Sequence, residues 1–124
     1  MIKTLGLLAL GLASAGAAHA LEKDVPAAVD AIRHASPLVI DARRADELAG
    51  GMLPGALHVP HDDMAAQAAT VAPVLDRPIV VYCRSGRRSD IATDTLRELG
   101  YTRVINGGGY EELAQALDAA RRSE

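Results

Sequence analysis

The one cysteine of the sequence, Cys83, opens a short basic loop. The residues that follow it are Arg84, Ser85, Gly86, Arg87, Arg88 and Ser89. Backbone N–H groups, the start of a helix and nearby guanidinium groups all stabilise a thiolate over a thiol. Gly86 lets successive N–H groups of such a loop point inward as an anion-binding nest. The loop therefore predicts a nucleophilic thiolate whose substrate is an anion.

Two plainer interpretations of this loop compete with a catalytic one. A lone cysteine is often a buried structural thiol, and three arginines can form a solvated basic patch. Three guanidinium groups would be costly beside an inert apolar site, however, and positive charge at the start of a helix opposes the helix dipole. An anion bound among the arginines is the simpler explanation.

The strands that position this loop are short apolar runs. Residues 79–82, Ile-Val-Val-Tyr, lead directly into Cys83, and a second run over residues 38–40 ends at Asp41. Apolar runs without alternation predict strands buried on both faces of a parallel sheet, with residues 79–82 as a central strand. Because ligands bind at the carboxyl ends of such strands, Cys83 is placed for chemistry.

Helical patterns alternate with these strands. The expected helices lie over residues 25–35 with Asp24 as N-cap, 46–49 as a single turn, 63–71 capped by Asp62 or His61, 89–99 and 110–120. In the fourth of these, Ile91, Ala92, Leu96 and Leu99 form the apolar stripe. Further strands are expected over 56–60 and 103–106, the latter followed by a flexible turn at residues 107–109. This alternation predicts an α/β fold, a single domain with a small parallel sheet covered by helices on both faces.

Length and composition exclude several classes of protein. The 124 residues allow one compact domain, and the apolar share of 49% includes 24 alanines, with no run of the roughly 20 apolar residues that span a bilayer. Three Tyr, no Phe, no Trp and a net charge of −3 argue against a nucleic-acid partner. One cysteine excludes an intrachain disulfide, a CxxC redox pair and a zinc site of several cysteines.

No metal or cofactor is expected. His58 and His61, followed by two aspartates, have a spacing that metal ligands can show. Pro60 lies between them at a junction of strand and helix, which favours a surface cap over a metal site.

The first twenty residues have the pattern of a secretory signal. Lys3 precedes an apolar run over residues 5–18, and Ala18-His19-Ala20 matches a cleavage site. The alternative is an uncleaved anchor, but the run is short and rich in glycine. We expect cleavage after Ala20, a mature domain over residues 21–124 in the periplasm, and no membrane contact after cleavage.

The order of several motifs resembles the single-domain rhodaneses, the thiosulfate sulfurtransferase family. Residues 83–89 resemble the family's active-site loop without departure. Asp41, Arg43 and Glu47, followed by residues 51–60, resemble its upstream signature, and residues 100–109 its C-terminal pattern. The resemblance covers about residues 25–117 and implies a rhodanese-like domain. With the export signal, it is closest to small periplasmic rhodaneses of the phage-shock E type.

At two positions the sequence departs from the family pattern, so the roles of the usual family side chains cannot be assigned there. Met52 stands where the family usually has His, and His58 stands where it has Asn. Tyr110 and Leu113 occupy a region where many relatives carry Trp, which affects packing rather than chemistry.

The resemblance implies sulfur transfer in two steps through a persulfide on Cys83. The loop from Arg84 to Ser89 would hold the anionic persulfide, Arg88 together with Arg84 would neutralise the leaving sulfonate, and Asp41 and Arg43 would orient the loop through an ion pair. The implied partners are a small anionic donor such as thiosulfate and a thiophilic acceptor such as cyanide or a thiol. A monomer is expected.

Two other functions remain open from the sequence. A persulfide carrier that delivers or senses sulfur without turnover would need the same cysteine. A cysteine-based phosphatase or arsenate reductase needs Cys-x5-Arg, whereas Arg88 gives Cys-x4-Arg, a shorter loop that suits sulfur better than phosphate.

Overall fold

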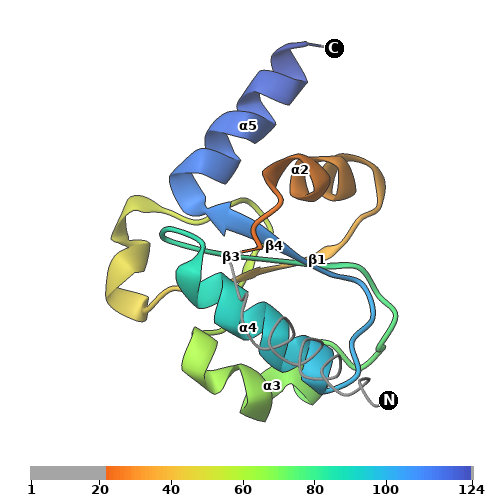
Figure 1. The fold of residues 1–124 in the computed structure, drawn as a ribbon. Coiled ribbons are helices and arrows are strands. Elements are labelled where there is room, and N and C mark those ends of the chain that lie inside the picture. The colour runs from red at the N-terminus through yellow and green to blue at the C-terminus, as the bar shows by residue number, and fades with distance from the viewer. Residues whose placement is uncertain (1–21, 124) are drawn as a thin grey trace, which may run out of the picture.

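The computed structural model describes residues 22–123, so the predicted signal over residues 1–20 lies outside the described residues. Within them one parallel sheet has the strand order β2-β1-β3-β4 (Figure 1). Its strands are β1 (Leu38–Asp41), β2 (Leu57–His58), β3 (Ile79–Cys83) and β4 (Val104–Gly109). The predicted central strand is therefore one of the two interior strands, and β2 is shorter than expected.

Helices cover both faces of the sheet, as the sequence predicts. They are α2 (Val25–His34), α3 (Met64–Val71), α4 (Arg87–Glu98) and α5 (Tyr110–Arg122). On one face α3 and α4 pack on Ile79, Val81 and Cys83, and on the other α2 and α5 pack on Val80 and Tyr82. The two-residue period of β3 thus divides the core into two layers and places Cys83 on the α3–α4 side.

The N-cap predicted for α2 is confirmed, whereas the N-cap predicted for α3 is wrong. The side chain of Asp24 accepts a hydrogen bond from the Ala27 N–H at 3.0 Å and caps α2 as predicted. Asp62 and His61 do not cap α3, because they form the 3₁₀ turn η2 (His61–Asp63) that leads into it. A second 3₁₀ turn, η1 (Ala45–Gly50), replaces the expected single turn over residues 46–49.

Only two of the four residues predicted to form the apolar stripe of α4 are buried. Ala92 and Leu96 are fully buried, but Ile91 and Leu99 are about half exposed. The face of α4 that packs on the sheet also buries the polar residues Ser89, Asp90 and Thr93. A search for apolar residues alone misplaces the stripe, because the buried start of this helix is polar.

The glycines at residues 107–109 form strand rather than the predicted flexible turn. They continue β4, and Gly109 pairs with Cys83 after a register shift in which β4 has one residue more than β3. A Cβ on Gly107 would lie 3.0 Å from Val80 Cγ1, and a Cβ on Gly109 would collide with the backbone carbonyl of Arg84. The glycines are therefore required by the close approach of β4 to its neighbours and to the cysteine loop.

Candidate active site

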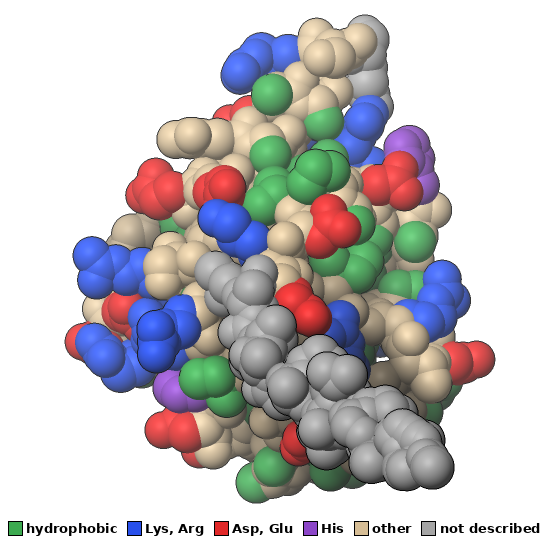
Figure 2. Space-filling model, viewed as in Figure 1, with side chains coloured by type: hydrophobic (Ala, Val, Ile, Leu, Met, Phe, Trp, Pro, Cys, Tyr) green, Lys and Arg blue, Asp and Glu red, His purple; other side chains and the backbone are tan. Residues whose placement is uncertain are grey.

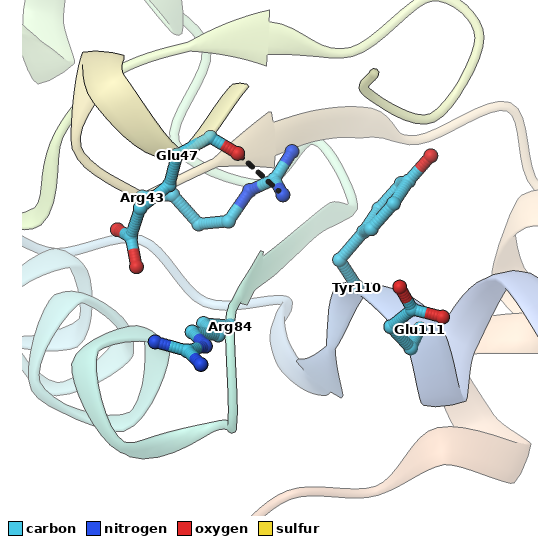
Figure 3. A pocket seen from close by; sticks show the side chains of 5 residues that line it. All are labelled: Arg43, Glu47, Arg84, Tyr110 and Glu111. Atoms are coloured by element: carbon cyan, nitrogen blue, oxygen red, sulfur yellow. Dashed lines mark hydrogen bonds between the residues drawn. The ribbon is translucent and has the colours of Figure 1, made fainter. Parts of the chain in front are cut away.

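A cavity of about 270 Å³ opens at the carboxyl ends of the strands (Figure 3). Its lining residues come from segments that follow three strands: Arg43 and Glu47 after β1, Arg84 after β3, and Tyr110 and Glu111 after β4. This is the edge of the sheet at which the sequence predicts a ligand.

Cys83 ends β3 directly before Arg84, has no exposed surface and is not itself one of the residues that line the cavity. The N–H of Gly86 donates a hydrogen bond to Cys83 Sγ at 2.9 Å, and the Ser89 hydroxyl lies 3.3 Å from the same sulfur. Gly86 adopts the left-handed conformation, φ +99°, and is the N-cap of α4. The sulfur therefore sits within the tight turn that begins a helix, where negative charge is stabilised.

A buried polar network behind Cys83 was missed from the sequence. The Ser89 hydroxyl lies 2.7 Å from Asn106 Oδ1, which also accepts a hydrogen bond from the Gly108 N–H at 2.9 Å. The Asn106 side chain donates to the Gly86 carbonyl at 3.2 Å. These contacts fix the cysteine loop against β4. The available signal was an Asn in an otherwise apolar strand pattern.

The three loop arginines diverge rather than surround one anion. Arg84 is exposed and lines the cavity, whereas Arg87 is exposed and does not line it. Arg88 forms a two-pronged ion pair with Glu47, with N–O distances of 2.5 and 2.8 Å. This arrangement differs from an anion bound among the arginines, because Arg88 is paired with Glu47 and Arg87 lies away from the cavity. Ser85 is exposed and does not line the cavity.

The Glu47–Arg88 pair changes the protonation of both groups. The hydrogen bonds from Arg88 lower the pKa of Glu47 to about 2, against the opposing effect of burial. The same hydrogen bonds raise the pKa of Arg88. Both groups are therefore charged at neutral pH, and the pair joins η1 to the start of α4.

Asp41 and Arg43 form a buried ion pair with an N–O distance of 2.7 Å. The Arg43 guanidinium also donates to the carbonyls of Glu47 and Gly51 at 3.2 and 2.7 Å, and it stacks over the Tyr110 ring at 4.4 Å. The hydrogen bond with Asp41 raises the pKa of Arg43. The pair holds the segment between β1 and Gly51 in place, and it is connected to the cysteine loop through Glu47 and the ion pair of Glu47 with Arg88.

Three lining residues were not identified as site residues from the sequence. Glu47 entered only as part of a motif, Tyr110 as the start of a helix and as a packing residue, and Glu111 only as part of that helix. All three lie just beyond the carboxyl end of a strand, which is the signal that could have found them.

The structure places His58 against the backbone. A ring nitrogen of His58 lies 2.7 Å from the Arg43 carbonyl and holds the backbone at this point. Among residues 22–123, no group of three or more His, Cys, Asp or Glu side chains is placed to hold a metal ion. Over the same residues, no helix has the length and apolar character to cross a membrane.

Charges of both signs surround the cavity. Figure 2 shows Lys and Arg side chains gathered on the side of the molecule where η1 lies, with Asp and Glu side chains beside them. The electrostatic field around the cavity therefore has contributions of both signs and is not uniformly positive.

Comparison with known proteins identifies a family. The profile of the Rhodanese-like domain matches residues 24–116. The thiosulfate sulfurtransferase PspE of Escherichia coli is 35% identical over 75 residues, which cover 60% of this chain and 72% of that protein. A sulfurtransferase of Allochromatium vinosum is 41% identical over 69 residues, covering 56% of this chain and 63% of that protein.

Solved structures agree with this assignment. A rhodanese with anions from E. coli has a TM-score of 0.58 at 34% identity and covers 63% of this chain and 92% of its own. The human single-domain sulfurtransferase TSTD1 has a TM-score of 0.61 at 29% identity and covers 78% and 97%. Because the family profile spans most of the chain, the chain belongs to the rhodanese family of sulfurtransferases.

Proposed function

We propose that the protein is a thiosulfate sulfurtransferase in which Cys83 carries sulfur as a persulfide. The observation that supports it most directly is the hydrogen bond from the Gly86 N–H to Cys83 Sγ at the start of α4. This geometry favours a thiolate nucleophile and, after transfer, an anionic persulfide.

In the first step the Cys83 thiolate attacks the outer sulfur of thiosulfate. A new S–S bond forms, the S–S bond of thiosulfate breaks, and its electron pair leaves with sulfite. The charge of −3 on the reactants equals that on the products, one persulfide anion and one sulfite dianion. No general base is needed when the thiolate is already formed.

In the second step an acceptor takes the outer sulfur of the persulfide. The acceptor's lone pair forms the new bond to sulfur, and the electron pair of the broken S–S bond returns to Cys83 as thiolate. The chain has no second cysteine to resolve the persulfide, so the acceptor must come from outside. Cyanide and thiols have the required nucleophilic character.

Different residues around the cavity bind the donor, position the cysteine loop and stabilise the persulfide. Arg84, which lines the cavity, places its positive charge near the sulfonate of the donor. Arg88 acts through its ion pair with Glu47 and positions the first turn of α4. The loop N–H groups up to Ser89 stabilise the persulfide, and Arg43 with Asp41 holds the opposite wall.

The test is mass spectrometry of the protein after incubation with thiosulfate. We expect a gain of one sulfur atom on Cys83 that is lost when cyanide is added, with formation of thiocyanate. Cys83→Ser is expected to fold, because the two side chains are similar in size, and to take up no sulfur. Substantial turnover of thiosulfate by Cys83→Ser would overturn the assignment of the nucleophile.

A persulfide carrier is the second candidate, favoured by the complete burial of Cys83. A buried sulfur is protected from small acceptors and reaches a partner only when the loop shifts. A carrier would gain sulfur in the same experiment, but it would keep that sulfur in the presence of cyanide.

We further propose that the chain is exported to the periplasm with cleavage after Ala20 and acts there as a monomer. The supporting pattern is the charged start, apolar run and small-residue site of residues 1–20. N-terminal sequencing of the exported protein should begin at Leu21, and sedimentation should give the mass of one chain. An uncut N-terminus or a larger particle would contradict this proposal.

A further inference from the structure

Residues 22–24, which precede α2 and lie against the cysteine loop, form a segment that we call the strap. The Glu22 N–H donates a hydrogen bond to Asp90 Oδ1 at 3.2 Å, and the Asp24 N–H donates to the Asn106 carbonyl at 2.7 Å. Asp90 lies in the first turn of α4, and Asn106 lies in β4. The strap therefore connects the two elements that hold the cysteine loop.

Lys23, in the middle of the strap, lies against the turn that Gly86 makes. A Cβ on Gly86 would be 3.5 Å from Lys23 Cδ, and a Cβ on Gly108 would be 3.4 Å from the same atom. Both glycines are buried, and both have positive φ values, +99° and +84°. The aliphatic stem of Lys23 thus covers the space that side chains would fill at these two glycines, a common use of a lysine stem.

The ammonium group of Lys23 is held by the first turn of α5. Its Nζ lies 3.0 Å from Glu112 Oε1, and both side chains are partly exposed. The carboxylate balances the ammonium charge, and solvent screens what remains. Any effect of Lys23 on the cysteine loop therefore comes mainly from the packing of its stem on Gly86.

The covered turn supplies the hydrogen bond on which the reactivity of Cys83 depends. The Gly86 N–H donates to Cys83 Sγ at 2.9 Å. A hydrogen bond is stronger where water is excluded, and a water molecule that reached this amide would compete with the sulfur for it. The strength of the contact thus depends on a turn that stays closed and dry.

We propose that Lys23 is a positioning residue for the Cys83 thiolate, because its stem keeps the Gly86 turn closed and holds the Gly86 N–H on the sulfur. This inference rests on the proposed sulfurtransferase function and adds to it a residue from outside the cysteine loop. Lys23 acts through Gly86 and touches neither the sulfur nor the donor.

Two simpler roles for Lys23 lead to different expectations. If the strap only stabilised the fold, loss of the stem would lower the unfolding temperature and leave the reactivity of the sulfur unchanged. If the ammonium charge acted on the thiolate, every substitution that removes the charge would have the same effect. The three roles can therefore be separated by variants that remove the stem and the charge independently.

The experiment measures the alkylation of Cys83 by iodoacetamide over a range of pH, in protein without added donor. Cys83 is the one cysteine of the sequence, so the reaction reports on it alone. Lys23→Ala removes both stem and charge, whereas Lys23→Met keeps a stem and removes only the charge. Glu22→Gln is the matched control, because it removes a charge from the neighbouring position and breaks the exposed ion pair with Arg97.

We expect Lys23→Ala to move the midpoint of the pH profile upward, by about a fivefold change in the proton affinity of the thiolate, the size of one ordinary hydrogen bond. The midpoint rises because the Gly86 N–H then stabilises the thiolate less. Lys23→Met and Glu22→Gln should keep the wild-type midpoint. Sulfur uptake from thiosulfate at neutral pH should slow in Lys23→Ala alone, and thermal unfolding checks that each variant keeps its fold.

The outcomes separate this inference from the proposed function. An unchanged midpoint in Lys23→Ala overturns the positioning role, and so do equal shifts in Lys23→Ala and Lys23→Met, because the charge would then act in place of the stem. Neither result affects the proposed function when wild-type protein loads sulfur. Failure of wild-type Cys83 to load sulfur overturns the proposed function, and the role of Lys23 in sulfur transfer falls with it.

Discussion

Cys83 Sγ contacts two hydrogen-bonding groups from its own loop and the first turn of α4. The Gly86 N–H donates directly, while the Ser89 hydroxyl has one proton and three acceptors within reach: Cys83 Sγ, the Gly86 carbonyl and Asn106 Oδ1. When Sγ is a thiolate, donation from Ser89 to sulfur becomes the stronger hydrogen bond. We infer that the Ser89 hydroxyl donates its proton to the sulfur when Sγ is anionic and to Asn106 Oδ1 otherwise.

Ser89→Ala tests this role at the scale of one residue. The variant should alkylate with iodoacetamide about tenfold more slowly at neutral pH, since a hydrogen bond to a charged group contributes about 1.5–3 kcal/mol and sulfur is a weak acceptor. Sulfur uptake from thiosulfate should fall by a similar factor. The control is Ser123→Ala, an exposed serine near the C-terminus. Wild-type alkylation in Ser89→Ala would contradict the role.

At the scale of elements, the end of β4 consists of glycines, and because they have no side chains the cysteine loop can pack directly against this strand. Gly107 and Gly109 are buried, and Gly109 lies directly against the backbone of Arg84. β4 then turns straight into α5, which brings Tyr110 and Glu111 to the cavity. One strand thus supports the loop and delivers part of the opposite wall.

Gly109→Ala should therefore disturb both stability and sulfur transfer. The added methyl group cannot avoid the Arg84 carbonyl without a backbone shift, and overpacking of this kind costs about 1–3 kcal/mol. Urea unfolding measures the loss, and uptake of sulfur from thiosulfate should slow because the loop is displaced.

Gly50→Ala provides the matched comparison, since a Cβ there meets nothing within 4 Å. Its unfolding midpoint should stay near the wild-type value. Equal stability of Gly109→Ala and Gly50→Ala would show that the contact with the loop is not tight.

At the scale of the whole molecule, the Glu47–Arg88 pair joins two parts of the chain that are far apart in sequence. Glu47 lies in η1 after β1, and Arg88 lies in the first turn of α4 after the cysteine loop. The Arg43 guanidinium donates to the Glu47 carbonyl, so the Asp41–Arg43 pair extends the same brace. The cavity keeps its shape because these ion pairs connect its walls.

Glu47→Gln should destabilise the fold by about 1–2 kcal/mol at pH 7, as expected for a partly exposed, charge-assisted pair. The pKa of Glu47 is about 2 in the fold, below its ordinary value of 4.5. Because the folded pKa is lowered, the stabilisation is fully present above about pH 4.5 and is lost as the pH falls toward 2.

Urea unfolding at several pH values checks this dependence. The stability difference between wild type and Glu47→Gln should be constant from pH 7 to about pH 5 and should shrink below it. Glu98→Gln, which removes an exposed carboxylate at the end of α4, is the control and should show no such pattern. A difference that grows on acidification would contradict the assignment.

Much of the fold followed from local patterns. The runs over residues 38–40 and 79–82 became interior strands, and Asp24 caps α2 as predicted. The errors arose where tertiary contacts override local preference. Ile91 and Leu99 are apolar but point away from the sheet, and the glycines at residues 107–109 extend because a strand needs close approach there.

The sequence by itself determined the α/β class, the position of Cys83 at a strand end and the identity of the loop that surrounds it. These depend on periodicity and on neighbours in the chain. Only the tertiary structure decided which charges are free, because pairing joins residues far apart in sequence. Glu47 pairs with Arg88 and Asp41 pairs with Arg43, whereas Arg84 and Glu111 line the cavity without an ion pair among residues 22–123.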